Sequence, residues 1–248
     1  MDKLTSIVNN FNSISLSQMD KVKLMKRTDT KYAFHFSKLS LLLSKLQHHY
    51  LILEIKKNRM QSYRSLYFDT VERKFYLDHH NQRVNRNKIR FREYIESKLV
   101  FMEIKTKNNK GRTTKKRIKV SSIPTSLNEI HHNFIHEIIG KELDVQAQQW
   151  INFNRLTFVN ILKNERLTID VNLNFSQNNH SVEMSDIVIA ELKQERMSRR
   201  SEFIRISKDL GIHPMRLSKY CYSSTQLNPN LKKNRFKKKL LYINKLVA

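Results

Sequence analysis

Hydrophobic and charged residues alternate along several segments of the chain, which is the pattern of β-strands that bury one face and leave the other polar. The segments 88–94 (KIRFREY) and 101–107 (FMEIKTK) each carry a charged side chain at nearly every second position. These charged positions are Lys88, Arg90, Arg92, Glu103, Lys105 and Lys107. The two segments therefore predict a strand pair, joined by a tight turn, whose polar face is mostly cationic and contains one carboxylate.

The same alternation recurs in the segments 111–120, 151–161, 165–175 and 186–196. Their polar positions include Thr113, Lys115, Arg117, Lys119, Arg155, Thr157, Arg166, Thr168, Asp170, Asn172, Glu191 and Lys193. In the segment 165–175 the opposite positions are Leu167, Ile169, Val171 and Leu173, which must face a core because their exposure would cost several kcal/mol, at roughly 1.5–3 kcal/mol for each side chain.

One strand of this kind is usually the solvated face of an ordinary sheet. Arg, Lys and Glu have low β-propensity, however, and here they recur in a consistent register on at least five strands. A sheet closed on itself, with its cations inside and helices packed outside, explains all of these strands at once. Such an interior needs a bound polyanion, because enclosed and unpaired cations repel one another and lose their hydration.

The identity of that polyanion follows from the residues beside the cations. A protein that reads bases needs exposed aromatic side chains or a recognition helix beside its basic residues, whereas Phe91, Phe101 and Phe158 are expected on the core side of their strands. A triphosphate chain instead requires cations around its oxygens and carboxylates that hold a divalent metal. The acids on the cationic faces are Glu103, Asp170 and Glu191. These features argue against nucleic acid and favour inorganic phosphate chains.

The remaining pattern predicts one domain over 27–225, preceded by a helical segment over 1–26 and followed by a basic tail over 226–248. Ser37 is expected to cap a helix that ends near His49, and Asp69 with Thr70 to open a short helix. The other expected elements are strands at 32–36, 51–57, 62–70 and 217–222 and helices at 126–143 and 201–210.

Composition narrows the partners and the compartment. The chain has 248 residues with 47 Lys plus Arg against 22 Asp plus Glu, a formal net charge of +25 that favours polyanionic partners. Its single cysteine, Cys221, excludes an internal disulfide and a four-thiolate zinc site. The paired histidines, at 48–49, 79–80 and 131–132, are expected at the surface near helix ends.

The sequence also predicts a cytoplasmic location, because it shows no signal-peptide core and no apolar window of transmembrane length. The tail carries six basic residues between positions 231 and 240. It is expected to be solvated and partly helical, with contact to an anionic membrane or to a polyphosphate product as the alternative.

An ordered series of motifs carries a family resemblance. The motifs are RTDTKY (27–32), YRSLYFDT (63–70), KIRFREY (88–94), FMEIKTK (101–107), the basic segment 111–120, RLT (155–157), RLTID (166–170), IAELK (189–193) and LSKY (217–220). In this order they resemble the VTC domain, the polyphosphate polymerase branch of the triphosphate tunnel metalloenzymes within the CYTH-like superfamily. The resemblance spans about 27–222, nearly the whole chain.

The resemblance implies an α+β fold with an eight-stranded antiparallel β-tunnel, open at both ends and covered by helices. It implies an enzyme that transfers the γ-phosphate of ATP to a growing polyphosphate chain with bound Mn²⁺ or Mg²⁺. The implied catalytic residues are Arg90, Arg92, Lys105, Arg166 and Lys193, and the implied substrate-binding residues are Lys31, Lys115, Arg117, Arg155 and Lys219. Which of Lys115 and Arg117 meets the phosphates stays open. Glu191 would be the principal metal ligand and Glu103 a helper.

Two departures refine this expectation. Many tunnel triphosphatases begin with E-x-E-x-K, whereas this chain has Arg27, Asp29 and Lys31 at that spacing, which favours the VTC branch and leaves one acid fewer for a second metal. The eukaryotic polymerases carry a phosphate-sensing helical domain and membrane helices, and neither is evident in the sequence. A bacterial stand-alone module is therefore expected, with a separate membrane protein as partner if translocation accompanies synthesis.

Two alternatives to the polymerase stay open. One is a triphosphatase that hydrolyses inorganic triphosphate or a nucleoside triphosphate, because one tunnel can bring either water or a phosphate acceptor to the γ-phosphate. The other is a polyphosphate-binding or nucleic-acid-binding module without turnover, and the carboxylates among the cations count against it.

Overall fold

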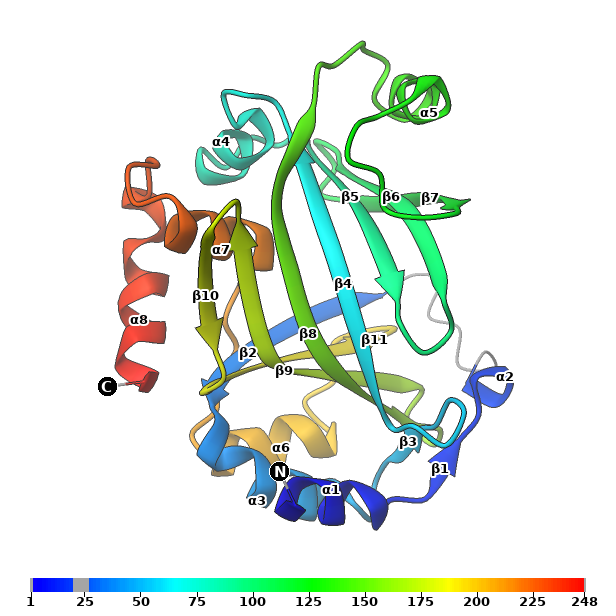
Figure 1. The fold of residues 1–248 in the computed structure, drawn as a ribbon. Coiled ribbons are helices and arrows are strands. Elements are labelled where there is room, and N and C mark those ends of the chain that lie inside the picture. The colour runs from blue at the N-terminus through cyan, green and yellow to red at the C-terminus, as the bar shows by residue number, and fades with distance from the viewer. Residues whose placement is uncertain (1, 20–26, 248) are drawn as a thin grey trace.

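A long, curved antiparallel sheet organises the chain (Figure 1). The computed structural model describes residues 2–19 and 27–247. Eight strands form the main sheet in the order β2-β11-β9-β8-β4-β5-β6-β7. Their bounds are Thr28–His35 (β2), Met60–Asp69 (β4), Arg86–Tyr94 (β5), Leu99–Lys107 (β6), Thr113–Val120 (β7), Gln146–Asn160 (β8), Glu165–Gln177 (β9) and Ile187–Gln194 (β11). The prediction of an α+β fold around an eight-stranded antiparallel sheet is confirmed.

Three short strands extend the main sheet. They are β1 (Ser13–Ile14), β3 (Leu51–Leu53) and β10 (His180–Met184). β1 pairs in parallel with β3, β3 pairs with β8, and β10 pairs with β9.

The strand register brings the charged side chains to a common face. Arg90 is paired with Glu103 across β5 and β6, and Arg155 with Asp170 across β8 and β9. The charges of Lys105 on β6 and Glu191 on β11, which are far apart in the strand order, nevertheless interact. The charged face is therefore the concave one.

The edge of β2 is covered by later parts of the chain rather than by another strand of the main sheet. The backbone N–H of Met215 donates to the Lys31 carbonyl at 2.6 Å, and Tyr32 forms an isolated bridge with Pro214. The Tyr242 hydroxyl donates to the Ala33 carbonyl at 3.4 Å. Within the described residues the ladder ends at β2 and β7. The loop and the helix cover the β2 edge, where free backbone groups would otherwise invite pairing with another chain.

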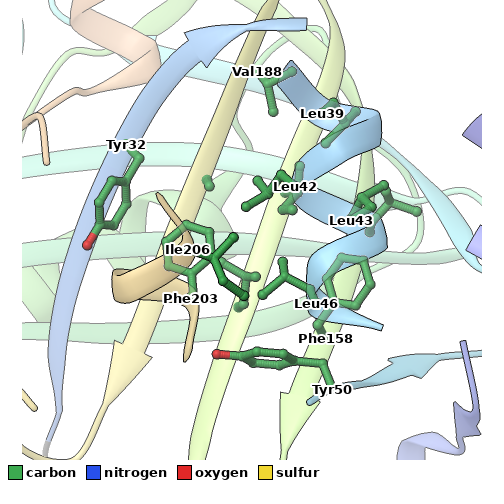
Figure 2. Packing of buried hydrophobic residues seen from close by; sticks show 14 of the residues in the cluster. Tyr32, Leu39, Leu42, Leu43, Leu46, Tyr50, Phe158, Val188, Phe203 and Ile206 are labelled. Carbon is green, nitrogen blue, oxygen red and sulfur yellow. The ribbon is translucent and has the colours of Figure 1, made fainter. Parts of the chain in front are cut away.

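Helices cover the convex face and bury its apolar residues (Figure 2). α1 (Asp2–Asn9), α3 (Leu39–Leu46) and α6 (Glu202–Asp209) pack at one end, and α5 (Glu129–Ile139) covers the strands at the other. Leu42 and Leu46 of α3 and Phe158 of β8 are fully buried in the first of these clusters. Each such side chain stabilises the fold by roughly 1.5–3 kcal/mol.

A β-bulge in β9 changes which residues face the concave side. Asn172 has a left-handed backbone with φ 51°, and the pairing of β9 with β8 shifts by one residue at this point. Leu173 and Phe175 therefore turn from the convex to the concave face, where they pack with Ile151. The prediction that Leu173 shares a face with Leu167 is wrong, because strict alternation cannot account for an inserted residue.

The aliphatic half of the concave face is covered by α7 (Lys219–Leu227). The strand expected over 217–222 is wrong: Ser218 caps a helix by accepting a hydrogen bond from the Cys221 N–H at 3.3 Å. The residues from 220 to 225 are all buried, and the Tyr220 ring stacks on Tyr67 with centroids 5.0 Å apart. Packing on several sides and the serine cap override the short alternating pattern that suggested a strand.

Other local expectations are corrected or narrowed. His35, not Ser37, caps the turn before α3, and that helix ends at Leu46 rather than near His49. The N-terminal segment contains α1 and the short α2 (Leu16–Met19), while the expected helical residues 20–26 lie outside the described part of the chain.

The tail and two of the histidines are better packed than expected. After the short turn η2 (Asn234–Phe236), the tail forms α8 (Lys237–Val247), which packs on the β2 side of the concave face through buried Ile243. His80 and His131 are buried rather than exposed: the first accepts from the Arg235 N–H, and the second completes the cap of α5. None of the helices in the described ranges is long and apolar enough to cross a membrane.

Asp69 ties α7 to α4 (Lys74–His80) and should be important for stability. Its carboxylate accepts from the N–H groups of Phe75 and Tyr76 at 2.8 and 3.0 Å and from the Tyr220 hydroxyl at 2.6 Å. Because Asp69→Ala leaves buried donors without partners, we expect it to lower the free energy of unfolding by about 3 kcal/mol. Urea unfolding measures this loss. Asp78→Ala, which removes an exposed ion pair with Lys74, is the control, and an equally small change in both variants would contradict the assignment.

Candidate active site

The concave side of the sheet carries a cluster of cations that we call the cationic face. It comprises Lys31, Lys88, Arg90, Arg92, Lys105, Lys115, Arg155, Arg166 and Lys193 from the strands and Lys219 from α7. Three carboxylates, Glu103, Asp170 and Glu191, lie among them. Most of the residues predicted as a site from the sequence therefore come together, although they derive from separate strands and one helix.

Glu103 is clamped between two cations. Its Oε2 accepts from Arg90 at 2.5 Å, and its Oε1 accepts from the Lys115 ammonium at 2.8 Å. The side chain is fully buried, which by itself would raise the pKa, but the surrounding cations outweigh burial and hold the pKa of Glu103 well below its usual range. Glu103 is therefore ionised and fixes the positions of both cations.

Asp170 forms a second clamp of the same kind. Arg155 donates to its two oxygens at 2.6 and 2.8 Å, and Lys219 also pairs with Oδ2. Desolvation would raise the pKa of Asp170, but Arg155 and Lys219 hold it well below its usual range. This bidentate pair orients the planar guanidinium, and it links α7 to the floor of the cationic face.

Glu191 differs from the other two carboxylates because it keeps contact with solvent. Lys193 approaches its Oε1 at 2.6 Å, and the side chain is 22% exposed. Although burial opposes ionisation, Lys193 and Lys31 lower the pKa of Glu191. Of these three carboxylates it is the most accessible to a bound ion or substrate.

Positive charge exceeds negative charge on this face. Arg92 is only 7% exposed, and its Nε donates to the neutral Ser65 hydroxyl at 3.0 Å. Burial raises the pKa of the Tyr67 hydroxyl, yet the combined effect of Arg90, Arg92 and Lys88 is larger and the pKa is lowered. A phenol that is easier to ionise despite its burial reports a strongly positive local potential, which favours a polyanion.

Aromatic rings support the buried guanidinium groups. Tyr63 and Phe153 stack with centroids 5.2 Å apart. Arg92 and Arg155 each lie over both rings, at 5.0 to 5.4 Å from the centroids, and the Lys219 ammonium lies 4.7 Å from Phe153. Cation–π contacts of this length stabilise cations in place, so the stack holds the charges without neutralising them.

One predicted residue, Arg117, lies at the margin of the cationic face. Arg117 is exposed and stacks over Phe101 at 4.4 Å, so Lys115 is the residue of β7 that reaches the buried carboxylate. Phe101 faces the cations, opposite Arg92 in the register, and its predicted core position is wrong. Arg166 is paired with Lys193 between β9 and β11.

The parts that complete the site have weaker signals in the sequence. Phe153 shares the parity of Arg155 on β8, which was the available signal for one ring of the aromatic stack, whereas Tyr63 lies on the face of β4 opposite to Arg64. The contact of α7 with the concave face had no signal in the sequence, because the serine-rich segment 218–225 lacks both an apolar stripe and a charged pattern.

The described residues fit a divalent metal only if the substrate contributes ligands. They contain no group of three His, Cys, Asp or Glu side chains arranged around one position. Both oxygens of Glu103 and of Asp170 are engaged by cations, whereas Glu191 is partly exposed. Mg²⁺ in phosphate-transferring sites is commonly held by one or two carboxylates together with phosphate oxygens and water. Glu191 fits such a site, and Glu103 fits the role of a charge that positions cations.

Comparison with known proteins gives a family and a fold. A family model described as the VTC domain matches residues 26–228. No curated protein matches the chain.

Solved structures match the chain at low sequence identity. A candidate adenylyl cyclase from Hippeastrum, described as having a dominant triphosphatase activity, is 12% identical with a TM-score of 0.53, and the match covers 82% of this chain and 97% of that one. A candidate adenylate cyclase from Bacillus halodurans is 13% identical with a TM-score of 0.49 over 79% and 96% of the two chains. The first likeness confirms the triphosphate tunnel fold.

Inorganic triphosphate should bind at the cationic face and raise the unfolding temperature of the protein. Arg92→Gln should reduce that increase, and the reduction should persist at high salt because enclosed charges are screened less than exposed ones. Arg64→Gln is the control, since Arg64 is exposed on the opposite face of β4 and pairs with Glu93. A buried site would be contradicted if Arg92→Gln and Arg64→Gln reduced the increase in unfolding temperature equally and both reductions disappeared at high salt. Thermal unfolding at two salt concentrations measures the difference.

The ion pairs should also make stability depend on pH in the acid range. The pKa of Asp170 is lower in the folded protein than the value of about 3.9 in an unfolded chain, so its stabilisation is present above about pH 4 and is lost as the pH falls toward the folded pKa. Asp170→Asn should therefore lose less stability than the wild type between about pH 5 and pH 2. Urea unfolding across that range tests this, with exposed Asp186→Asn as the control. Parallel curves for wild type and Asp170→Asn would contradict the assignment.

Proposed function

The chain belongs to the VTC domain family, and from that premise we propose that it is a metal-dependent enzyme that transfers the γ-phosphate of ATP to inorganic polyphosphate. One observation carries the proposal: the concave face holds more cations than carboxylates, and most of these cations are at least half-buried on strands that face one another. The substrates are ATP and inorganic polyphosphate or triphosphate, and the metal is Mn²⁺ or Mg²⁺.

The arrangement suits a linear phosphate chain. Arg90 and Arg92 come from β5, and Arg155 from β8 is held in the same region by the Tyr63 and Phe153 rings. A planar guanidinium group can donate two parallel hydrogen bonds to one phosphate, and several of them along the face can hold successive phosphates. The lysines add point charges between them. This set recognises phosphate oxygens and requires no contact with a base.

The reaction itself demands mainly position and charge. Phosphoryl transfer places the attacking and leaving oxygens in line and spreads negative charge over the transferred group, so fixed cations lower the barrier. Arg90 and Arg155 are fixed by Glu103 and Asp170, and they need little rearrangement when the substrate binds. Glu191 would hold the divalent metal together with substrate phosphates, and the metal when bound supplies further neutralisation of the phosphate oxygens.

Hydrolysis of a triphosphate is the second candidate function, and the position of α7 favours it. The helix occupies the aliphatic half of the concave face, and its N-terminal Lys219 reaches the cationic face. In-line transfer requires the acceptor to approach opposite to the leaving group. If α7 restricts that approach to small molecules, water would replace a phosphate chain as the acceptor.

The products of turnover separate these functions. We expect the purified protein with ATP and Mn²⁺ to yield chains that resolve as polyphosphate on a gel. Orthophosphate alone would favour the triphosphatase, and the absence of both products would overturn enzymatic activity.

Glu191→Gln should reduce turnover at least a hundredfold, equivalent to about 2.7 kcal/mol of barrier, while triphosphate binding persists.

Exposed Glu183 on β10 provides the matched control for Glu191. Glu183→Gln makes the same chemical change away from the cationic face and should leave turnover unchanged. Equal turnover in wild type and Glu191→Gln would show that the metal assignment is wrong.

A further inference from the structure

Positive charge continues beyond the candidate active site along the N-terminal end of α7. The Lys31 ammonium donates to the Leu217 carbonyl at 3.2 Å, and the Lys88 ammonium donates to the Ser218 hydroxyl at 2.6 Å. Both acceptors are neutral. These two contacts therefore do not neutralise the lysines where the cationic face meets the beginning of α7.

The charge then reaches a surface built by β5, α4 and α8. Arg86 is paired with Lys107 at the start of β5. The His79 ring of α4 packs against Phe236 with centroids 6.0 Å apart, and the Lys239 ammonium of α8 lies 5.7 Å from the same Phe236 ring. We call His79, Arg86 and Lys239 the rear cluster, and Lys31 and Lys88 connect it to the cationic face. Its members are half-buried, so they are reachable from solvent.

The His79 ring of the rear cluster has an unsatisfied polar atom. Its Nδ1 atom is buried and has no hydrogen-bond partner among the described residues. Burial lowers the pKa of His79 to about 2, with further lowering by Lys88, Arg86, Lys239 and Lys31. A buried polar atom without a partner, surrounded by positive charge, is costly unless an anion binds there.

We propose that the rear cluster is a second phosphate-binding site, which holds the part of an inorganic polyphosphate chain that lies beyond the reacting phosphates. The proposal rests on the proposed function and deepens it. Because α7 covers the straight path along the concave face, an acceptor chain in line with the γ-phosphate has to pass beside the N-terminal end of that helix. Lys31 and Lys88 lie at this point, and His79, Arg86 and Lys239 lie beyond it.

The rear cluster includes a residue outside the segment that matches the family. Lys239 belongs to α8, whereas the family match ends at residue 228. The packed tail therefore places Lys239 beside the path of the phosphate chain, and its Phe236 ring packs against His79 and holds it in position. A long phosphate chain would reach both sites, and inorganic triphosphate would fill only the first.

Two neighbouring lysines of α8 allow a matched test of binding. Lys239 is half-buried in the rear cluster, and Lys238 is exposed beside it. Lys239→Gln should weaken binding of a long inorganic polyphosphate roughly tenfold, as expected for loss of a hydrogen bond to a charged group, and leave binding of triphosphate unchanged. Lys238→Gln should leave both unchanged. Calorimetry with the full chain measures both ligands.

Equal losses for the two variants, or a loss of triphosphate binding in Lys239→Gln, would overturn the second site. A single-stranded RNA of similar total charge serves as the competing ligand. If RNA binds as tightly as polyphosphate and depends equally on Lys239, the site takes nucleic acid and the proposal fails.

The His79 ring gives an independent readout that does not rely on affinity. A bound phosphate chain stabilises the imidazolium, so long polyphosphate should raise the pKa of His79, observed by NMR of the ring, while triphosphate should not. An unchanged His79 titration with saturating long polyphosphate would overturn the proposal. Neither measurement requires turnover, so a chain-length-dependent site can be established even if ATP yields no polymer and the proposed function fails.

Discussion

The enclosure of more cations than carboxylates on the concave face is the constraint on which the rest of the structure depends. Each carboxylate of this face lies against at least one cation, and Glu103 and Asp170 each hold two. The strands can therefore approach one another without strong repulsion. The remaining charge is held by aromatic rings and neutral hydroxyl groups, which position cations without cancelling them. A face built in this way is stable alone and is still strongly attractive to a linear polyanion.

A single inserted residue divides the concave face into two functional halves. Before the bulge at Asn172, β9 presents Asp170 to the cations, and after it β9 presents Leu173 and Phe175 to α7. The helix thus packs on an apolar surface, and its N-terminal end contacts the charged half through Ser218 and Lys219. Packing and substrate binding are joined at this point, because the element that buries the apolar half also limits the route of a phosphate chain.

Much of the fold and the site could be predicted from the sequence because both depend on alternation. The period of two in segments such as 88–94 and 166–170 assigns side chains to faces, and Arg90, Glu103 and Asp170 lie on the common face that this period predicts. Alternation fails where the backbone departs from regular pairing, as at Asn172, and where tertiary contacts decide the local structure, as in α7. The partners of each charge, such as Lys115 with Glu103, depend on strand order, which a single sequence does not specify directly.

We propose that the concave face binds a phosphate chain beside a metal held by Glu191. A crystal structure of the protein with inorganic triphosphate and Mn²⁺ tests it most directly, since the anomalous signal of manganese locates the metal. We expect triphosphate between Arg92 and Arg155, with manganese bonded to a Glu191 oxygen and to phosphate oxygens. Triphosphate on the outer surface, or manganese away from Glu191 in a crystal that holds both ligands, would contradict it.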